Sequence, residues 1–118
     1  RIIMVGSIDG LNVNQMPTFS YGPSKAAVHH LTRTLAAHLA DRHITVNAIA
    51  PGLFPSKMTA ATIDAMGDKI IQGTPLKRAG KPSDMAGVAI YLSSRASSFV
   101  TGVVIPVDGG LTGAKGTL

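Results

Sequence analysis

The sequence predicts an α/β fold in which the strands of a parallel sheet alternate with helices that cover both of its faces. Three short β-type runs, each closed by glycine or proline, alternate with stretches of helical periodicity. Such alternation is typical of parallel β-α-β units. At 118 residues, 45% of them hydrophobic, the chain fits a single globular domain.

The first expected strand covers residues 2–5, a continuous apolar run typical of a strand buried on both faces. It ends at Gly6 and Ser7, so Ser7 should lie at the carboxyl end of the strand. Residues 8–20, rich in glycine, asparagine, proline and threonine, are expected to form a loop.

A helix is expected to follow this loop, with Ser20 as its N-cap and Pro23 in its first turn. It should end at residues 41–43. Apolar side chains that recur every four residues predict the face that the helix buries, namely Ala27, Leu31, Leu35 and Leu39.

The second expected strand, residues 44–50, is stopped by Pro51-Gly52. Residues 53–80 mix apolar positions with prolines and glycines, which predicts one or two short helices in a mobile segment. The run Lys-Pro-Ser-Asp at residues 81–84 is expected to open another helix.

The third expected strand, residues 103–107, contains Pro106, which cannot donate a ladder hydrogen bond and therefore indicates a sheet edge or a strand end. Residues 108–110 (Asp-Gly-Gly) are expected to form a turn with positive-φ glycines rather than a ligand site. Glycines within residues 111–118 predict a frayed tail.

The composition excludes several classes of site and segment. The absence of cysteine excludes disulfides, thiolate catalysis and cysteine-based zinc sites, and it is compatible with a cytoplasmic location. No apolar stretch reaches the ~18 residues of a membrane span, and the N-terminus lacks the pattern of a signal peptide. Because Arg1, not methionine, leads directly into a strand-like run, we expect the chain to be a fragment.

The formal net charge of +5 does not predict nucleic-acid binding. The eleven lysines and arginines are scattered along the chain, and only 4% of residues are aromatic, so no stacking platform accompanies them. A solvated basic surface is favoured, and it would also suit an anionic cofactor or an acidic carrier protein.

Tyr21 and Lys25 are the first candidates for chemistry. A spacing of four places them on one helical face, and a nearby ammonium stabilises a phenolate, which makes a tyrosine a usable acid or base. Ser7 and Pro51-Gly52 each end a strand, and the carboxyl ends of parallel strands share the edge where open α/β folds bind ligands. We therefore expect these groups to converge on one crevice.

The order of the motifs resembles the short-chain dehydrogenase/reductase family over almost the whole chain. The matching motifs are Val5-Gly6-Ser7, Tyr21-x-x-Ser24-Lys25-Ala26-Ala27, Val46-Asn47-x-Ile49-x-Pro51-Gly52, Arg78-x-Gly80-x-Pro82-x-Asp84-Met85-Ala86, Thr101-Gly102 and Val107-Asp108-Gly109-Gly110. Within the family, residues 51–59 and the long loop between Ser7 and Tyr21 are most similar to 3-oxoacyl-carrier-protein reductases, in particular the subgroup associated with rhamnolipid biosynthesis.

The resemblance implies catalytic roles for three residues. Tyr21 would be the general acid that protonates a carbonyl oxygen as hydride arrives, or the base in the reverse direction. Lys25 would assist Tyr21 and hydrogen-bond the nicotinamide ribose. Ser7 would hydrogen-bond the substrate oxygen and stabilise the developing alkoxide.

It also implies a cofactor site without a metal. Pro51, Gly52 and the backbone at Phe54 would pack along the nicotinamide, and Ser56 would contact its carboxamide or the phosphates. We favour NADP(H) over NAD(H) as the cofactor.

Some of the family's parts have no counterpart in this sequence: its glycine-rich dinucleotide turn, its Asn-Asn-Ala-Gly segment and its catalytic asparagine. The resemblance therefore implies that residues 1–118 are the C-terminal catalytic portion of one Rossmann-type domain. They would form the C-terminal half of a doubly wound parallel sheet with flanking helices, without the N-terminal dinucleotide-binding half. The parent enzyme would be a homotetramer or homodimer that associates through the helix of Tyr21 and the final strand.

The implied reaction is hydride transfer between NAD(P)(H) and a carbonyl or secondary alcohol. The expected substrate is a small-molecule or carrier-bound carbonyl compound, specifically a 3-oxoacyl thioester; sugars, polyols and other secondary alcohols are the alternative. A further alternative is a catalytically silent fragment, because an unpaired sheet edge and a missing phosphate-binding half would prevent cofactor binding. No membrane or nucleic-acid partner is expected.

Structural interpretations stand beside the functional ones. Ser7 alternatively caps local backbone, and Ser56 alternatively caps a short helix. Three histidines without neighbouring carboxylate or cysteine ligands are interpreted as surface or subunit-contact residues rather than a metal site: His29, His30 and His38. Met58, Met66 and Met85 are expected to be adaptable packing around a substrate loop.

Overall fold

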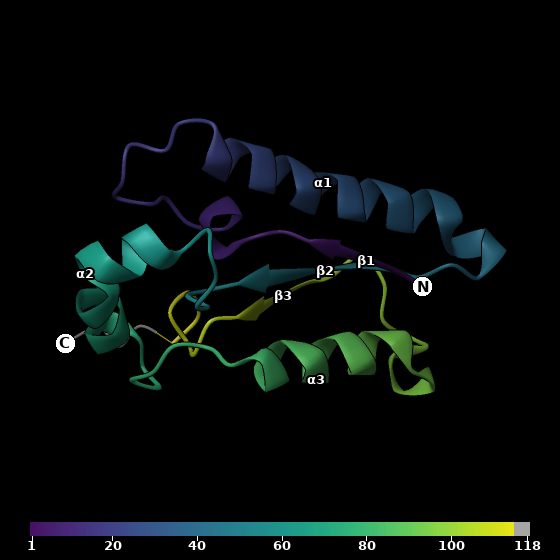
Figure 1. Cartoon of the computed structure of the whole chain (residues 1–118). Helices are drawn as coiled ribbons and strands as arrows, with labels where there is room; N and C mark the ends of the chain where they lie inside the picture. Colours follow the sequence, from purple (N-terminus) through teal and green to yellow (C-terminus); the bar gives the residue numbers. More distant parts are fainter. Residues whose placement is uncertain (115–118) are drawn as a thin grey trace.

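In the computed structural model, which describes residues 1–114, three parallel strands form one sheet in the order β1-β2-β3. The strands are β1 (Ile2–Val5), β2 (Val46–Pro51) and β3 (Val104–Val107). Ile2 lies opposite Val46, and Ala48 lies opposite Val104. Helices cover both faces of the sheet, so the predicted α/β fold class is confirmed (Figure 1).

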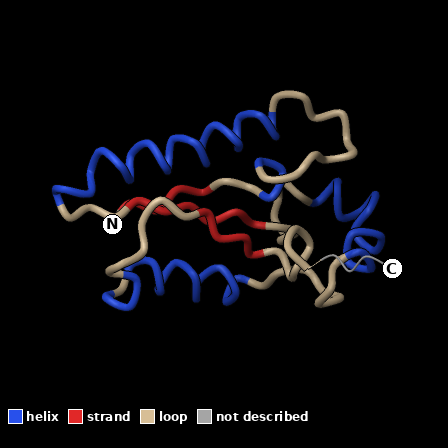
Figure 2. The backbone as a smooth tube through the Cα atoms, turned by 180° about the vertical axis from the view of Figure 1, so that it is seen from behind, coloured by secondary structure: helices blue, strands red, loops and turns tan. Residues whose placement is uncertain are grey.

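The three α-helices are α1 (Tyr21–Leu39), α2 (Ala60–Gly73) and α3 (Pro82–Ser93). Helix α1 lies on one face of the sheet and α3 on the other, an arrangement that Figure 2 shows from behind. Helix α2 lies beyond the carboxyl ends of the strands, next to the long loop that precedes α1. Three short 3-10 helices complete the described elements: η1 (Ile8–Gly10), η2 (Ala40–Arg42) and η3 (Arg95–Ser97).

The ends of α1 follow the prediction except for the N-cap. In the described part of the chain the Ser20 side chain makes no capping hydrogen bond; instead the Ser24 hydroxyl donates to the Tyr21 carbonyl over 2.7 Å. At the other end, η2 and a left-handed His43 (φ 58°) turn the chain toward β2. Strand β2 starts two residues later than expected, and residues 53–80 contain α2 as their one α-helix.

The face that α1 buries is not the predicted leucine stripe. The buried residues are His29, Thr32 and Ala36, whereas Leu31 is 44% exposed. Small side chains allow α1 to approach the sheet closely, and the Thr32 hydroxyl satisfies itself by donating to the Val28 carbonyl over 2.8 Å. A four-residue apolar repeat therefore predicted the wrong face.

The strand buried on both faces is β2 rather than β1. Val46, Ala48 and Ala50 of β2 are fully buried, whereas Val5 of β1 is 59% exposed. The reason is position: β2 is the central strand, with α1 and α3 on its two faces, and β1 is an edge strand within residues 1–114. The predicted double burial of residues 2–5 is therefore wrong for this chain.

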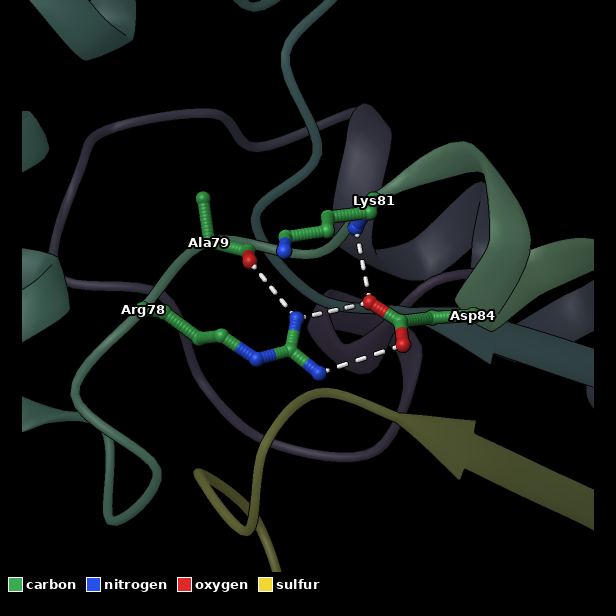
Figure 3. Close-up of polar contacts among 4 residues, drawn as sticks. All are labelled: Arg78, Ala79, Lys81 and Asp84. Carbon is green, nitrogen blue, oxygen red and sulfur yellow. Dashed lines mark hydrogen bonds and ion pairs between the residues drawn. The ribbon is translucent and has the colours of Figure 1, made fainter.

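Helix α3 starts where predicted. An ion pair joins Asp84, in its first turn, to Arg78 in the segment before the helix (Figure 3). Asp84 accepts from the Lys81 backbone N–H over 2.7 Å and from both terminal nitrogens of Arg78, over 2.7 Å and 3.1 Å. The hydrogen bonds from Arg78, and next that from Lys81, lower the pKa of Asp84 to about 2.

The third strand and the turn after it follow the prediction. Strand β3, with Pro106, lies at a sheet edge of the described residues, and Asp108 is followed by Gly109 and Gly110 at positive φ. The Asp108 carboxylate accepts from the Gly110 N–H over 2.9 Å and from the Thr112 hydroxyl over 2.6 Å. Of the predicted frayed tail, residues 111–114 instead form a hydrogen-bonded turn, because the Ala114 N–H donates to the Gly110 carbonyl over 2.9 Å; residues 115–118 lie outside the described residues. Within residues 1–114, none of the helices has the length and apolarity needed to cross a membrane.

Candidate active site

A cavity of about 610 Å³ opens at the carboxyl ends of the strands, between the loop that precedes α1 and helix α2. Its walls come from segments far apart in the sequence. Four of the predicted site residues line it together: Ser7, Tyr21, Pro51 and Gly52. The predicted convergence of strand ends and the start of a helix therefore occurs in this fold.

Ser7 leaves β1 in an extended conformation and is buried. Its Oγ accepts a hydrogen bond from the Asp9 backbone N–H over 3.1 Å and caps η1. Ser7 is thus the local cap that the structural interpretation expects. A hydroxyl can accept and donate at the same time, so its proton is still available for a ligand oxygen in the cavity.

Lys25 lies one turn beyond Tyr21, with Nζ 5.7 Å from the centre of the phenol ring. Nζ donates to the Val5 carbonyl over 3.2 Å, which ties α1 to the end of β1. An ammonium has three protons, so this bond leaves two for other acceptors. Lys25 therefore lies near the Tyr21 ring and is not among the described residues that line the cavity.

The Pro51-Gly52 turn is held by the neighbouring strand. The Gly52 N–H donates to the Val107 carbonyl over 2.9 Å. A Cβ on Gly52 would lie 2.8 Å from the Cα of Asp108, so no larger residue fits without a backbone shift. The turn brings the backbone of Gly52 to the wall of the cavity that Tyr21 also lines.

The structure does not bring Phe54 and Ser56 into this cavity. The Phe54 ring lies where a Cβ on Gly80 would be, and it lines a second cavity of about 500 Å³ near β3. Ser56 is exposed, and its Oγ accepts from the Thr59 N–H over 3.2 Å. Thr59, three residues later, lines the main cavity and donates its hydroxyl proton to the Phe54 carbonyl over 2.6 Å.

The outer wall of the cavity carries apolar side chains from two segments, with polar ones such as Gln15 and Lys69 between them. Val13 and Met16 come from the loop, while Met58, Met66 and Ile70 come from α2 and the segment before it. Val13 is 98% and Met58 75% exposed, so much apolar surface is uncovered at the entrance. Met58 and Met66 match the predicted methionine set; Met85 is not among the lining residues.

His29 is the residue that the sequence interpretation misplaced. It is only 2% exposed, so the expected surface or subunit-contact position is wrong. Its Nε2 accepts from the Ser7 backbone N–H over 3.4 Å. The signal was the spacing: His29 follows Lys25 by four residues, as Lys25 follows Tyr21, which places all three on one side of α1.

The surroundings of His29 favour the neutral imidazole. Burial lowers the pKa of His29, the backbone of Gly10 opposes that shift, and the charges of Arg33 and Lys25 add to it. Elsewhere in residues 1–114, no three histidine or aspartate side chains gather closely enough to hold a metal ion.

Comparison with known proteins matches residues 1–112 to the family model described as enoyl-(acyl carrier protein) reductase. The chain is 45% identical over 112 residues to the rhamnolipids biosynthesis 3-oxoacyl-[acyl-carrier-protein] reductase of Pseudomonas aeruginosa, covering 93% of this chain and 44% of that protein. It is 44% identical over 115 residues to the L-tagatose-forming galactitol 2-dehydrogenase of Cereibacter sphaeroides, covering 94% of this chain and 45% of that enzyme. The chain thus spans less than half the length of these curated relatives.

Solved structures of similar sequence also share the fold of this chain. The fold is similar to that of Pseudomonas aeruginosa RhlG in an NADP active-site complex, with a TM-score of 0.86 and 43% identity over 95% of this chain and 46% of that one. It is also similar to a putative NAD(P)-dependent gluconate 5-dehydrogenase from Beutenbergia cavernae with bound NADP, with a TM-score of 0.90 and 39% identity over 94% of this chain and 45% of that one.

Proposed function

Because the chain belongs to the short-chain dehydrogenase/reductase family, we propose that residues 1–118 are the catalytic C-terminal portion of a 3-oxoacyl thioester reductase. The longer polypeptide that would contain them is called the parent protein below. Its reaction is hydride transfer from NADPH to the 3-oxo group of an acyl thioester, free or bound to a carrier protein. The short coverage of the relatives, and the absence of a glycine-rich dinucleotide turn from this sequence, support the assignment to one half of a domain.

The residues at the cavity fit the nicotinamide end of the cofactor, whose chemistry is to supply hydride. Pro51-Gly52 brings backbone without a long side chain to one wall. Lys25, with two protons unused by Val5, can hydrogen-bond a ribose hydroxyl beside Tyr21. NADP(H) is favoured because NADP is bound in two of the similar structures.

The chain's own residues carry the proton chemistry. Ser7 donates a hydrogen bond from its hydroxyl to the substrate oxygen and keeps its own proton, while the Asp9 N–H fixes its Oγ. Tyr21 gives its phenolic proton to that oxygen as negative charge develops. Hydrogen bonds from both residues stabilise the negative charge that develops on this oxygen, a role that water would have in solution.

The observation that carries the substrate proposal is the apolar outer wall. A polyol has a hydroxyl on every carbon, and each one that loses water needs a new partner. Val13, Met16, Met58, Met66 and Ile70 offer none. Among the polar neighbours, Asn14 already bonds Asp9 and the Met16 N–H, whereas Asn12, Gln15, Thr62 and Lys69 also line the cavity. An acyl chain instead gains about 0.8 kcal/mol for each methylene that it buries there.

The test is a pair of assays on the parent protein. NADPH oxidation, followed at 340 nm with an acetoacetyl thioester, should exceed NADP⁺ or NAD⁺ reduction with galactitol by more than about 100-fold in kcat/KM, a difference of ~2.7 kcal/mol. A preference for galactitol would select the polyol alternative and reject the thioester. Running each assay with both NAD(H) and NADP(H) also tests the cofactor preference.

We also propose that the 118-residue chain alone is catalytically silent. The support is the exposed edge strand β1, with Val5 59% exposed, and the absence of any glycine-rich phosphate-binding turn. Titration of the isolated chain with NADPH, followed by nucleotide fluorescence, should give no saturable binding in the micromolar range. Tight binding would reject this proposal.

For the parent protein we propose a homotetramer or homodimer and a cytoplasmic location. The outward side of α1, where Leu31 is 44% exposed, supports association through this helix. The cysteine-free sequence suits a reducing compartment. Light scattering of the purified parent protein tests the first of these proposals.

A further inference from the structure

Helix α1 holds the end of β1 at two points on successive turns. Lys25 Nζ donates to the Val5 carbonyl over 3.2 Å, and the Ser7 N–H donates to His29 Nε2 over 3.4 Å. The two contacts lie on either side of Gly6. They connect the helix that carries Tyr21 to the backbone that carries Ser7, so they fix how these two side chains lie relative to each other.

The backbone of two glycines lies against the imidazole of His29. A Cβ on Gly6 would overlap Nε2, and a Cβ on Gly10 would lie 2.8 Å from Cε1. Because neither glycine has a side chain, the space between Gly6 and Gly10 accommodates the ring; this space is called the slot below. The ring is almost fully buried, so its contact with Ser7 is shielded from solvent.

We propose that His29 is a positioning residue for the reaction, holding the Ser7 backbone through a neutral imidazole so that the Ser7 hydroxyl faces the substrate oxygen. This proposal rests on the proposed reductase function. The acceptor matters because Ser7 is buried: without it, the N–H loses its partner and the residue can rotate to find another. With the imidazole in place, two hydrogen bonds orient Ser7: His29 accepts from its backbone N–H, and its Oγ accepts from the Asp9 N–H.

The contact also assigns the tautomer. Because Nε2 accepts, the proton of the neutral ring is on Nδ1. Nδ1 is buried, and within the described residues it makes no hydrogen bond. A charged imidazolium would direct an Nε2–H at the Ser7 N–H, two donors facing each other, so the contact exists only with the neutral form.

Two substitutions separate positioning from simple filling of space. In the parent protein, His29→Gln keeps an acceptor at about the reach of Nε2, whereas His29→Leu fills similar volume without one. We expect His29→Leu to lower kcat for the acetoacetyl thioester about tenfold, equivalent to one hydrogen bond of ~1.4 kcal/mol, with KM for NADPH unchanged. His29→Gln should restore kcat to within about threefold of wild type.

The control is His30→Leu, at the adjacent exposed position, which should leave kcat unchanged. If His29→Leu and His29→Gln have the same kcat, whether high or low, the acceptor is irrelevant and the proposal is overturned. Melting temperatures of both variants identify a loss of kcat that merely follows unfolding.

A measurement independent of activity completes the test. Nitrogen-15 NMR of the wild-type parent protein at neutral pH should show the Nδ1–H tautomer for His29, together with a Ser7 amide resonance that shifts in His29→Leu but not in His30→Leu. The Nε2–H tautomer would overturn the positioning role whatever the activity. The expected tautomer in a parent protein that reduces no thioester would reject the reductase function alone.

Discussion

The backbone N–H of Ser7 and the Nε2 of His29 lie 3.4 Å apart in a buried contact between the end of β1 and the third turn of α1. Gly6, immediately before Ser7, has no side chain that would separate them. The same helix presents Tyr21 to the cavity two turns earlier. The relative placement of the two candidate proton donors is therefore a property of how α1 packs on one strand end.

Replacement of the phenol is the direct test of the proton transfer. In the parent protein, Tyr21→Phe should lower kcat for the acetoacetyl thioester by at least about 100-fold, because a general acid contributes 10²–10⁴ to such a step. The melting temperature should change little, since no described hydrogen bond involves the hydroxyl. Tyr91→Phe, an exposed tyrosine on α3, is the matched control. Activity that survives Tyr21→Phe contradicts the mechanism.

The buried imidazole predicts a loss of stability in mild acid. Burial, with Arg33 and Lys25, lowers the pKa of His29 below its ordinary 6.5. Between 6.5 and the lower folded-state pKa, the unfolded chain binds more protons than the folded one. The free energy of unfolding should therefore fall as pH decreases through this window, and His29→Gln should flatten that part of the curve. Urea unfolding at a series of pH values measures both; an equal slope in the variant would contradict the prediction.

The fold could be predicted from the sequence because the signals were local. Apolar runs closed by glycine or proline located the three strands, and the Lys81–Asp84 run located the start of α3. The prediction of which strand is buried on both faces was wrong, because burial depends on tertiary structure. The double burial expected for residues 2–5 is found in β2, since a strand's position in the sheet, and not its own residues, sets the number of its neighbours.

At the candidate site, too, the predictions that rest on local signals and on general sheet geometry are confirmed, whereas the prediction of which helix face is buried is wrong. Ser7, Tyr21 and Pro51-Gly52 converge as expected because parallel strands place their carboxyl ends at one edge. Their predicted roles stay predictions. His29 was misplaced because α1 packs closely enough for small and polar residues to form its buried face, against the usual preference for leucine.

The apolar wall predicts a dependence on acyl chain length. Met66→Ser in the parent protein should lower kcat/KM for a 3-oxooctanoyl thioester about tenfold relative to an acetoacetyl thioester, because the longer chain loses apolar contact worth ~1.4 kcal/mol. Leu76→Ser, an exposed leucine that lines the other cavity, is the control. An unchanged ratio would mean that the chain binds elsewhere.

The ion pair at the start of α3 predicts a second, more acidic transition. Hydrogen bonds from Arg78 and Lys81 lower the pKa of Asp84 from 3.8 to about 2, so its stabilising effect is fully present above 3.8 and is lost as pH falls through 2. Asp84→Asn should reduce the pH dependence of the melting temperature in this range. Asp64→Asn, at an exposed position on α2, should retain it. Scanning fluorimetry between pH 2 and pH 5 makes the comparison.

The slot around His29 predicts a clash that a second substitution relieves. A Cβ at Gly6 would overlap Nε2, so Gly6→Ala should destabilise the parent protein by about 1–3 kcal/mol. The matched control is Gly87→Ala in the exposed part of α3, where an added Cβ meets no described atom within 4 Å, and which should stabilise by about 0.5–1 kcal/mol. Adding His29→Ala to Gly6→Ala should cost less than His29→Ala costs in wild type, because the methyl group then occupies space that the ring has left. Strict additivity in urea unfolding would mean that Gly6 is required for a reason other than the imidazole.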